Sequence, residues 1–227
     1  MGRWEPNARE RLERAAMELF RERGFEQTTA AQIAGRAGLT ERTFFRHYAD
    51  KREVLFAGAA ALEALFVDTL AAVPESAAPI DAVEATLAAV AEEAFAGRRE
   101  FARRRQAVIV ANAELREREL IKLAVISGRL AGELRRRGVE EPEASLAAEA
   151  GMAVFKVGFE RWVAEDPEAG AGEDGAGEAG AVDSGAVDSG AAERGEPALG
   201  AFLAEAMGEL KAMAGPRHGA GAGAGAP

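Results

Sequence analysis

Apolar residues recur at helical spacing along almost the whole chain, and no stretch shows the alternation typical of a strand. The first repeat lies in residues 7–23, where the apolar positions are Leu12, Ala15, Ala16, Leu19 and Phe20. Gly24 follows as a helix end, with Phe25 placed for the hydrophobic contact of such a cap. The pattern therefore predicts an all-α fold that opens with a helix over residues 7–23.

Two short helices should follow the first. Thr29 and Gln32 have the spacing of a capping box and so predict a helix start. Gly38 breaks that helix, and Thr40 can cap a third helix that ends at about His47. Helix, tight turn and second helix is the layout in which the second helix enters the major groove of DNA.

Longer helices are predicted for the rest of the chain. Asp50 and Glu53 form another capping-box pattern, which predicts one helix over residues 51–71. Later helices are predicted over residues 80–95, 98–112, 114–137, 142–165 and 197–213. Residues 166–196 change to glycine, alanine and acids and include the duplicated GAVDS. This composition predicts a disordered acidic loop there and a second flexible segment over residues 215–227.

The net charge of −10 does not describe the N-terminal part of the chain. Residues 1–51 hold ten Lys/Arg and eight Asp/Glu, a charge of +2, whereas residues 165–197 hold ten acids and one arginine, a charge of −9. Because the local field governs what approaches a surface, the mildly basic N-terminal part is compatible with DNA binding.

Composition removes several classes of chemistry. The chain has no cysteine, which excludes disulfides, thiolate nucleophiles and thiol metal sites. Its histidines are His47 and His218, too few for a histidine metal site or a Ser-His-Asp triad, so we expect no catalytic residue, metal or cofactor. No apolar run nears the roughly 20 residues of a membrane span, and the N-terminus lacks the form of a signal peptide. We expect a cytoplasmic protein, without a membrane partner, that is not an enzyme.

Aromatic and basic residues are crowded into residues 37–51. Phe44 and Tyr48 are four positions apart and share one helix face, which should pack against the first helix. The positions that can then turn toward DNA are Arg42, Thr43, Arg46 and His47. Lys51 and Asp50 lie at the next helix start, where a cation and backbone N–H groups can hold a phosphate. The arrangement favours a DNA-binding helix-turn-helix.

The segment from Ala8 to about Leu55 resembles the TetR family of bacterial one-component regulators. The resemblance rests on AAMELFRERGFEQTTAAQIAGRAGLTERTFFRHYADKREVL, where glycine, threonine, aromatic and basic landmarks stand at the family's spacing. The later helices match the family only in number and order. The resemblance implies a DNA-binding domain over residues 1–52 and a helical effector-binding and dimerisation domain over residues 53–214. The acidic loop at 166–196 would lie within the second domain, and residues 215–227 would form a disordered tail.

The resemblance also implies a set of DNA contacts. They are Thr28, Thr29, Thr40, Arg42, Thr43, Phe45, Arg46, His47 and Lys51. Thr28 or Thr29 would contact a phosphate, and His47 and Lys51 would hold others. Arg42 and Thr43 would lie in the major groove, with Arg42 pairing with guanine. Phe45 stands where the family often has tyrosine, so its contact would be apolar.

A homodimer is a further implication. The last helix supports it with a heptad-like repeat of Leu199, Leu203, Ala206, Leu210 and Met213. Together with the preceding helix, it gives an expected interface of Phe155, Phe159, Trp162, Leu199, Phe202, Leu203, Leu210 and Met213. Two such helices from each subunit can form a four-helix bundle about a two-fold axis. The alternative is that these stripes face the subunit's own core.

An effector pocket between helices is expected as well. Its candidate lining is Phe95, Phe101, Val108, Phe155 and Trp162, with Gln106 or Asn112 as polar anchors. Ordinary packing is the alternative for each of these residues.

These features together predict a DNA-binding transcriptional regulator. We expect a repressor that binds a palindromic operator in double-stranded DNA as a homodimer and is released by a hydrophobic small-molecule effector. The alternatives are a regulator that acts without a small-molecule ligand or as an activator, and, least favoured, a helical enzyme.

Overall fold

The computed structural model describes residues 7–165 and 198–214, and these residues form ten α-helices and no strand. The helices are α1 (Ala8–Arg23), α2 (Ala30–Arg36), α3 (Glu41–His47), α4 (Lys51–Leu55), α5 (Ala59–Ala72), α6 (Pro79–Phe95), α7 (Arg99–Val110), α8 (Ala113–Arg136), α9 (Glu143–Ala164) and α10 (Leu199–Ala214). The all-α prediction is confirmed. The predicted acidic loop at 166–196 and the tail at 215–227 lie outside the described residues.

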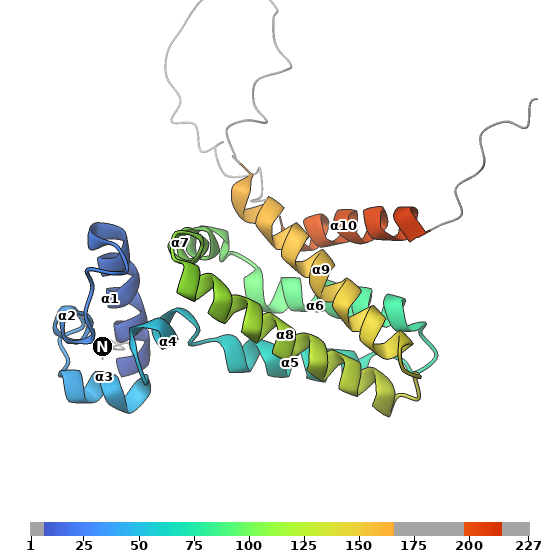
Figure 1. The fold of residues 1–227 in the computed structure, drawn as a ribbon, viewed down its shortest axis with the longest axis horizontal. Helices are drawn as coiled ribbons and strands as arrows, with labels where there is room; N and C mark the ends of the chain where they lie inside the picture. The colour runs from blue at the N-terminus through green and yellow to red at the C-terminus, as the bar shows by residue number, and fades with distance from the viewer. Residues whose placement is uncertain (1–6, 166–197, 215–227) are drawn as a thin grey trace, which may run out of the picture.

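The helices fall into two groups (Figure 1). Helices α1 to α4 form a small unit at one end, here called the head (residues 7–57). Helices α5 to α10 form the larger body (residues 59–165 and 198–214). The end of α7 lies beside α1, and α4 leads from the head into the body (Figure 1).

Short-range capping explains why the head helices start where they do. The Asn7 side chain accepts from the backbone N–H of Glu10 at the start of α1. Thr29 and Gln32 form the predicted capping box at α2, and Thr40 caps α3 by accepting from the backbone N–H of Thr43. Each cap satisfies an N–H group that the first turn of a helix leaves unpaired.

The head has its own apolar core. Its buried members include Leu12, Leu19, Phe20, Phe25, Ile33, Phe44, Tyr48, Val54, Leu55 and Phe56. Phe44 and Tyr48 are buried as predicted, with their ring centroids 5.6 Å apart. The Tyr48 hydroxyl donates to Glu13 Oε1 at 2.8 Å. The rings therefore hold the seven-residue α3 against α1, because so short a helix is not stable by itself.

Residues 51–71 are two helices rather than the single helix predicted. Arg105 Nε donates to the Leu55 carbonyl at 2.8 Å, and the Ala59 N–H bonds instead to the Phe56 carbonyl at 2.9 Å. In a continuous helix Ala59 would bond to Leu55. Phe56 is buried at this break, with the guanidinium carbon of Arg105 5.1 Å from its ring centroid. A side chain from α7 thus divides α4 from α5.

The body core surrounds α9, which packs against α6, α8 and α10. Gly158 permits the close approach of α10, because a Cβ there would lie 2.7 Å from Leu203 Cδ2 and 3.1 Å from the Phe202 carbonyl oxygen. Arg99 is buried and caps the end of α9 by donating to the carbonyls of Trp162, at 2.8 Å, and Glu165. A cation is favourable at that helix end. The start of α7 is therefore fixed to α9.

Candidate nucleic-acid interface and ligand cavity

The outward face of α3 combines positive charge with one aromatic ring. Arg42, Arg46 and His47 are exposed, and Phe45 is 53% exposed. Phe45 stands edge-on to the buried Phe44, with centroids 5.4 Å apart. Neither Arg42 nor Arg46 makes a hydrogen bond or ion pair within the part of the chain that the structure describes. These two guanidinium groups are thus available to an external partner.

The threonines predicted to contact DNA have different surroundings. Thr28 is 1% exposed, and its hydroxyl donates to the Gly24 carbonyl at 2.8 Å. Its proposed phosphate contact is therefore withdrawn, because the hydroxyl is enclosed and already bonded. Thr29 and Thr40 are exposed helix caps. The hydroxyl of Thr43, which is half-buried, lies 2.9 Å from that of Thr40. Three of the four threonines thus remain near the surface of the head.

Lys51 is engaged within the head. Its Nζ donates to the carbonyls of Phe25, at 2.8 Å, and Glu26, at 3.2 Å. The same Nζ lies 4.3 Å from the centroid of the Phe25 ring. The side chain is half-buried and joins the start of α4 to the end of α1. Lys51 therefore has a structural role in addition to the phosphate contact predicted for it.

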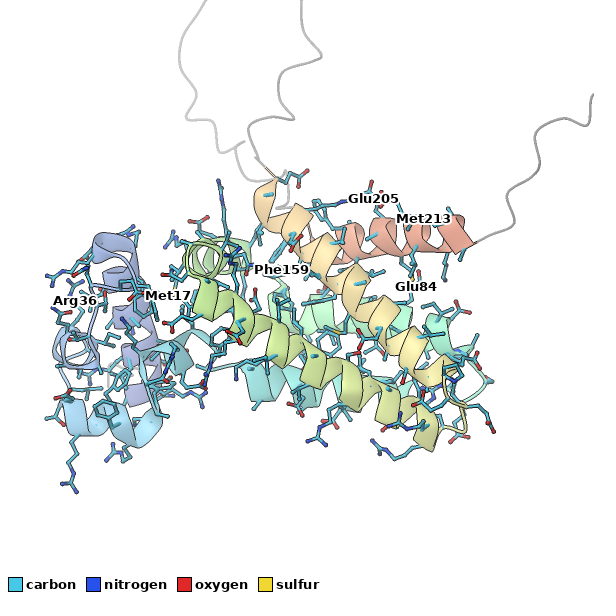
Figure 2. All side chains as sticks on the ribbon, in the orientation of Figure 1. Met17, Arg36, Glu84, Phe159, Glu205 and Met213 are labelled. Atoms are coloured by element: carbon cyan, nitrogen blue, oxygen red, sulfur yellow. The ribbon has the colours of Figure 1, made fainter. Side chains whose placement is uncertain are left out.

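The remaining charge on the head is partly neutralised. Arg36 of α2, labelled in Figure 2, pairs with Glu18 at 3.2 Å and Glu22 at 2.8 Å, both from α1. Its charge is thus balanced within the head. Arg42 and Arg46 therefore present unpaired positive charge on the outward face of α3, where a phosphate backbone can be attracted.

A cavity of about 490 Å³ lies between the head and the body. Met17 of α1 and Phe159 of α9, both labelled in Figure 2, contribute to its wall from the two units. Of the residues predicted for an effector pocket, the cavity is lined by Phe95, Phe101, Gln106 and Phe155. Phe56, at the break between α4 and α5, also lines it. The sequence pattern did not single out Phe56 or Met17, because they come to the cavity only when the head packs against the body.

Three predicted pocket residues lie elsewhere. Asn112 Nδ2 donates to the Val108 carbonyl at 2.7 Å, and Val108 packs against the apolar core of the head. Trp162 is 2% exposed and packs in the body core beside Phe95, with centroids 6.0 Å apart. None of the three is among the residues that line the cavity. Ordinary packing, the alternative reading of the pattern, accounts for them.

The polar wall of the cavity is organised by Glu119 of α8. Glu119 Oε1 accepts from Arg105 Nη1 at 3.0 Å, and Glu119 Oε2 accepts from Gln106 Nε2 at 3.2 Å. Burial lowers the pKa of the Arg105 guanidinium, and the charge of Glu119 and its hydrogen bond act to raise it. Arg105 also holds the Leu55 carbonyl, as described above. One residue of α7 therefore joins the cavity wall to the end of α4.

Other ion pairs cross from the head to the body. Glu53 of α4 pairs with Arg118 and, at 3.9 Å, with Lys122 of α8. Arg52 pairs with Glu114 at 3.2 Å. The prediction that Asp50 starts a helix is confirmed, because its carboxylate accepts from the backbone N–H groups of Arg52 and Glu53. The side chain of Glu53 is instead engaged by α8.

The stripes predicted to form a dimer interface largely face the subunit's own core. Phe155, Trp162, Leu199 and Leu203 are each at most 5% exposed. Phe159, Phe202 and Leu210 are half-buried, whereas Met213 is 74% exposed. The opposite face of α9 carries a second apolar series at heptad-like spacing: Leu146, Ala150, Ala153 and Val157. Leu146 is 66% and Val157 40% exposed, Ala153 is exposed and Ala150 is half-buried, so most of this series faces solvent in the single chain.

Comparison with known proteins identifies the head. Residues 13–57 match the family described as bacterial regulatory proteins, tetR family. The head is a tetR-family DNA-binding domain. The chain is also 39% identical over 82 residues to the HTH-type transcriptional regulator TcmR of Streptomyces glaucescens. That match covers 36% of this chain and 36% of TcmR, so it spans about a third of the relative's length.

Solved structures share the whole fold. SmeT of Stenotrophomonas maltophilia, in its complex with triclosan, superposes with a TM-score of 0.52 at 23% identity, covering 72% of this chain and 83% of SmeT. The fatty acid degradation regulator FadR from Bacillus halodurans gives 0.52 at 17% identity, covering 92% and 96%. A small N-terminal helical unit followed by a larger helical body is thus the fold that the chain shares with these structures. TcmR and FadR are each described as regulators. Among the described helices, none has the length and apolar character needed to cross a bilayer.

Proposed function

We propose that the chain is a cytoplasmic transcriptional repressor that binds a palindromic operator as a homodimer and is released by an apolar small molecule. The observation that supports this most directly is the outward face of α3. There, Arg42 and Arg46 are exposed and have no partner in the described chain, on a tetR-family head. Arginine in the major groove can pair with guanine O6 and N7, whereas phosphate contacts set position.

Arg42 is proposed as the base-reading residue. It lies in the first turn of α3, the end of a recognition helix that contacts base edges. Arg46 and His47 lie in the last turn, where they would hold phosphates. Thr29 and Thr40 would add polar contacts at the helix starts, and Phe45 an apolar one.

A palindromic site requires two heads related by a two-fold axis. We assign the dimer contact to the apolar series Leu146, Ala150, Ala153 and Val157 on α9, together with the exposed side of α10 and Met213. The support is that this series is apolar, regularly spaced and largely exposed, whereas most of the originally predicted residues are used by the subunit's own core.

Release would follow from contacts between the cavity and the head. A ligand in the cavity touches α7 through Phe101 and Gln106 and the head through Phe56. Arg105, on the same helix α7, holds the carbonyl at which α4 ends. A ligand that prefers a different position of α7 would therefore shift α4 and the spacing of the two α3 helices. A ligand can release DNA only if it binds the DNA-incompetent arrangement more tightly than the DNA-competent one.

The test is selection of bound fragments from a random DNA pool, followed by titration of the selected duplex. The wild-type affinity should fall steeply with rising salt, as expected for phosphate contacts. Arg42→Ala should cost about 1–3 kcal/mol and reduce discrimination among bases. Arg103→Ala, an exposed arginine on α7 in the body, is the matched control and should change neither property. Failure to enrich any sequence at low salt would contradict the proposed function.

A further inference from the structure

Two side chains of α1 hold α3 at its two ends. Before α3, Arg11 donates to the Ala37 carbonyl, from Nε at 3.0 Å and from Nη2 at 2.6 Å. At the other end, where α3 stops at Tyr48, the Tyr48 hydroxyl donates to Glu13 Oε1 at 2.8 Å. The orientation of α3 on the head therefore depends on polar contacts with α1 as well as on apolar packing.

The contact between Tyr48 and Glu13 is well defined on both sides. The Tyr48 side chain is 5% exposed, and burial, followed by the hydrogen bond to Glu13, raises the pKa of its hydroxyl above the ordinary value of 10.0. The hydroxyl is therefore a donor at neutral pH. Arg9 Nε also donates to Glu13 Oε1, at 3.2 Å, and so restrains the acceptor.

A directional contact at this end matters because α3 has only seven residues and is not stable by itself. Apolar packing has no preferred direction, whereas a hydrogen bond weakens when its angle changes. Arg46 and His47 lie in the last turn of α3, next to Tyr48. A rotation of α3 at Tyr48 would carry both side chains away from the phosphates proposed for them, and phosphate contacts fix the register in which bases are read.

Resting on the proposed function, we infer that Glu13 is a positioning residue for DNA recognition, which acts through the Tyr48 hydroxyl to keep α3 in the orientation that lets Arg42 reach a guanine. The negative charge of Glu13 would repel phosphate, so its contribution comes from the oxygen atom that accepts from Tyr48. One net hydrogen bond corresponds to about a five-fold change in the population of the competent orientation, and affinity falls with that population.

Two variants of the full chain isolate the acceptor. Both hydrogen bonds that the Glu13 carboxylate makes within the described residues end on Oε1, so Glu13→Gln keeps the acceptor that Tyr48 needs. Glu13→Met has a side chain of the same length without that acceptor. Because both variants remove the negative charge, a difference between them does not arise from repulsion of phosphate.

Glu13→Met should bind the selected duplex about five-fold more weakly than Glu13→Gln. A scrambled duplex is held by phosphate contacts in many arrangements, so it should bind the two variants equally. Equal affinity of the two variants for the selected duplex would overturn the inference, as would an equal loss on both duplexes.

Tyr48→Phe tests whether the effect passes through the hydroxyl, since it removes the hydroxyl and keeps the buried ring. In the Tyr48→Phe background, Glu13→Met and Glu13→Gln should bind the selected duplex equally, because the bond that distinguished them is already absent. A five-fold difference that persists in this background would overturn the role of Tyr48 and with it the inference.

A spectroscopic measurement separates positioning from a merely structural contact. Tyr48 is the only tyrosine of the chain, so the tyrosine Raman doublet reports the hydrogen bonding of this one hydroxyl. The doublet should indicate a donating hydroxyl in the wild type and in Glu13→Gln but not in Glu13→Met. Loss of the bond in Glu13→Met without loss of affinity for the selected duplex would show a structural contact only and would overturn the inference.

The same titrations distinguish this inference from the proposed function. Failure of the wild type to enrich any sequence would sink the regulator and the positioning role together. Enrichment by the wild type, combined with equal binding of the two Glu13 variants, would sink the positioning role alone.

Discussion

Lys51 has a structural role in the head in addition to the phosphate contact predicted from the sequence. Its ammonium is bonded to the Phe25 and Glu26 carbonyls and lies over the Phe25 ring. We predict that Lys51→Ala lowers the free energy of unfolding by about 1–2 kcal/mol, because charged hydrogen bonds and a cation–π contact are lost. Denaturant unfolding measures this change. Arg46→Ala is the control: it should weaken DNA binding but leave unfolding within about 0.5 kcal/mol. Equal stability of the two variants would show that the Lys51 contacts contribute little.

Asp50 makes the stability of the head depend on pH. Burial acts to raise the pKa of its carboxyl group, but hydrogen bonds from Arg52 and Glu53 outweigh burial and hold the pKa below its usual value of 3.8. Because the pKa is lowered in the folded state, the stabilisation of the fold by the Asp50 carboxylate is fully present above about pH 3.8. That stabilisation is lost as the pH falls through the folded-state pKa. Asp50→Ala should therefore cost about 1 kcal/mol at pH 6 and progressively less below pH 3.8. Urea unfolding at several pH values tests this, and a cost that grows as pH falls would contradict it.

The turn between α2 and α3 depends on a glycine. Gly38 has φ +64°, and a Cβ there would lie 2.9 Å from Arg11 Nη2. The left-handed conformation disfavours any residue with a side chain. We predict that Gly38→Ala lowers the free energy of unfolding by about 1–2 kcal/mol. Gly35 is an exposed residue of α2, and a Cβ added there meets no atom within 4 Å. Gly35→Ala should therefore raise the free energy of unfolding by up to about 1 kcal/mol. Thermal or urea unfolding compares the two variants, and changes of the same sign would be inconsistent with this account.

Elements set by local contacts could be predicted from the sequence, and those set by distant contacts could not. The caps Thr29 and Thr40 depend on residues three positions away, so their helices were found with nearly correct bounds. The break between α4 and α5 depends on Arg105, which is 50 residues from the Leu55 carbonyl that it binds. Thr28 was misassigned because its bond to Gly24 depends on how the chain turns after α1. Periodicity carries none of this information.

The same limit applies to the dimer helices. Both faces of α9 are apolar, one with large side chains such as Phe155 and Trp162 and the other with Ala153 and Val157. The sequence pattern favoured the larger side chains for the interface, but these fill the body core because they bury more area there. Of the residues predicted for an effector pocket, Phe95, Phe101, Gln106 and Phe155 line the cavity. Its boundary with the head depends on Met17 and Phe56.

At the scale of the whole molecule, α9 should control assembly. We predict that Val157→Glu shifts the chain toward a monomer, because it places a charge in an apolar seam, and that it weakens operator binding with it. Sedimentation velocity measures the first change. Val110→Glu on α7, where valine is also more than a third exposed, is the matched control and should leave the oligomeric state unchanged. A Val157→Glu protein with unaltered sedimentation would move the dimer contact away from this face.

The proposed function requires that α3 enters the major groove and that Arg42 pairs there with a guanine. The most direct measurement replaces each guanine of the selected duplex in turn by 7-deazaguanine, which removes the N7 acceptor and keeps base pairing. The wild-type chain should lose about 1–3 kcal/mol of binding free energy when 7-deazaguanine stands at one symmetry-related pair of guanines. The affinity of Arg42→Ala should not change when the same guanines are replaced. A position-independent response, or an equal loss for both proteins at every guanine, would contradict the account.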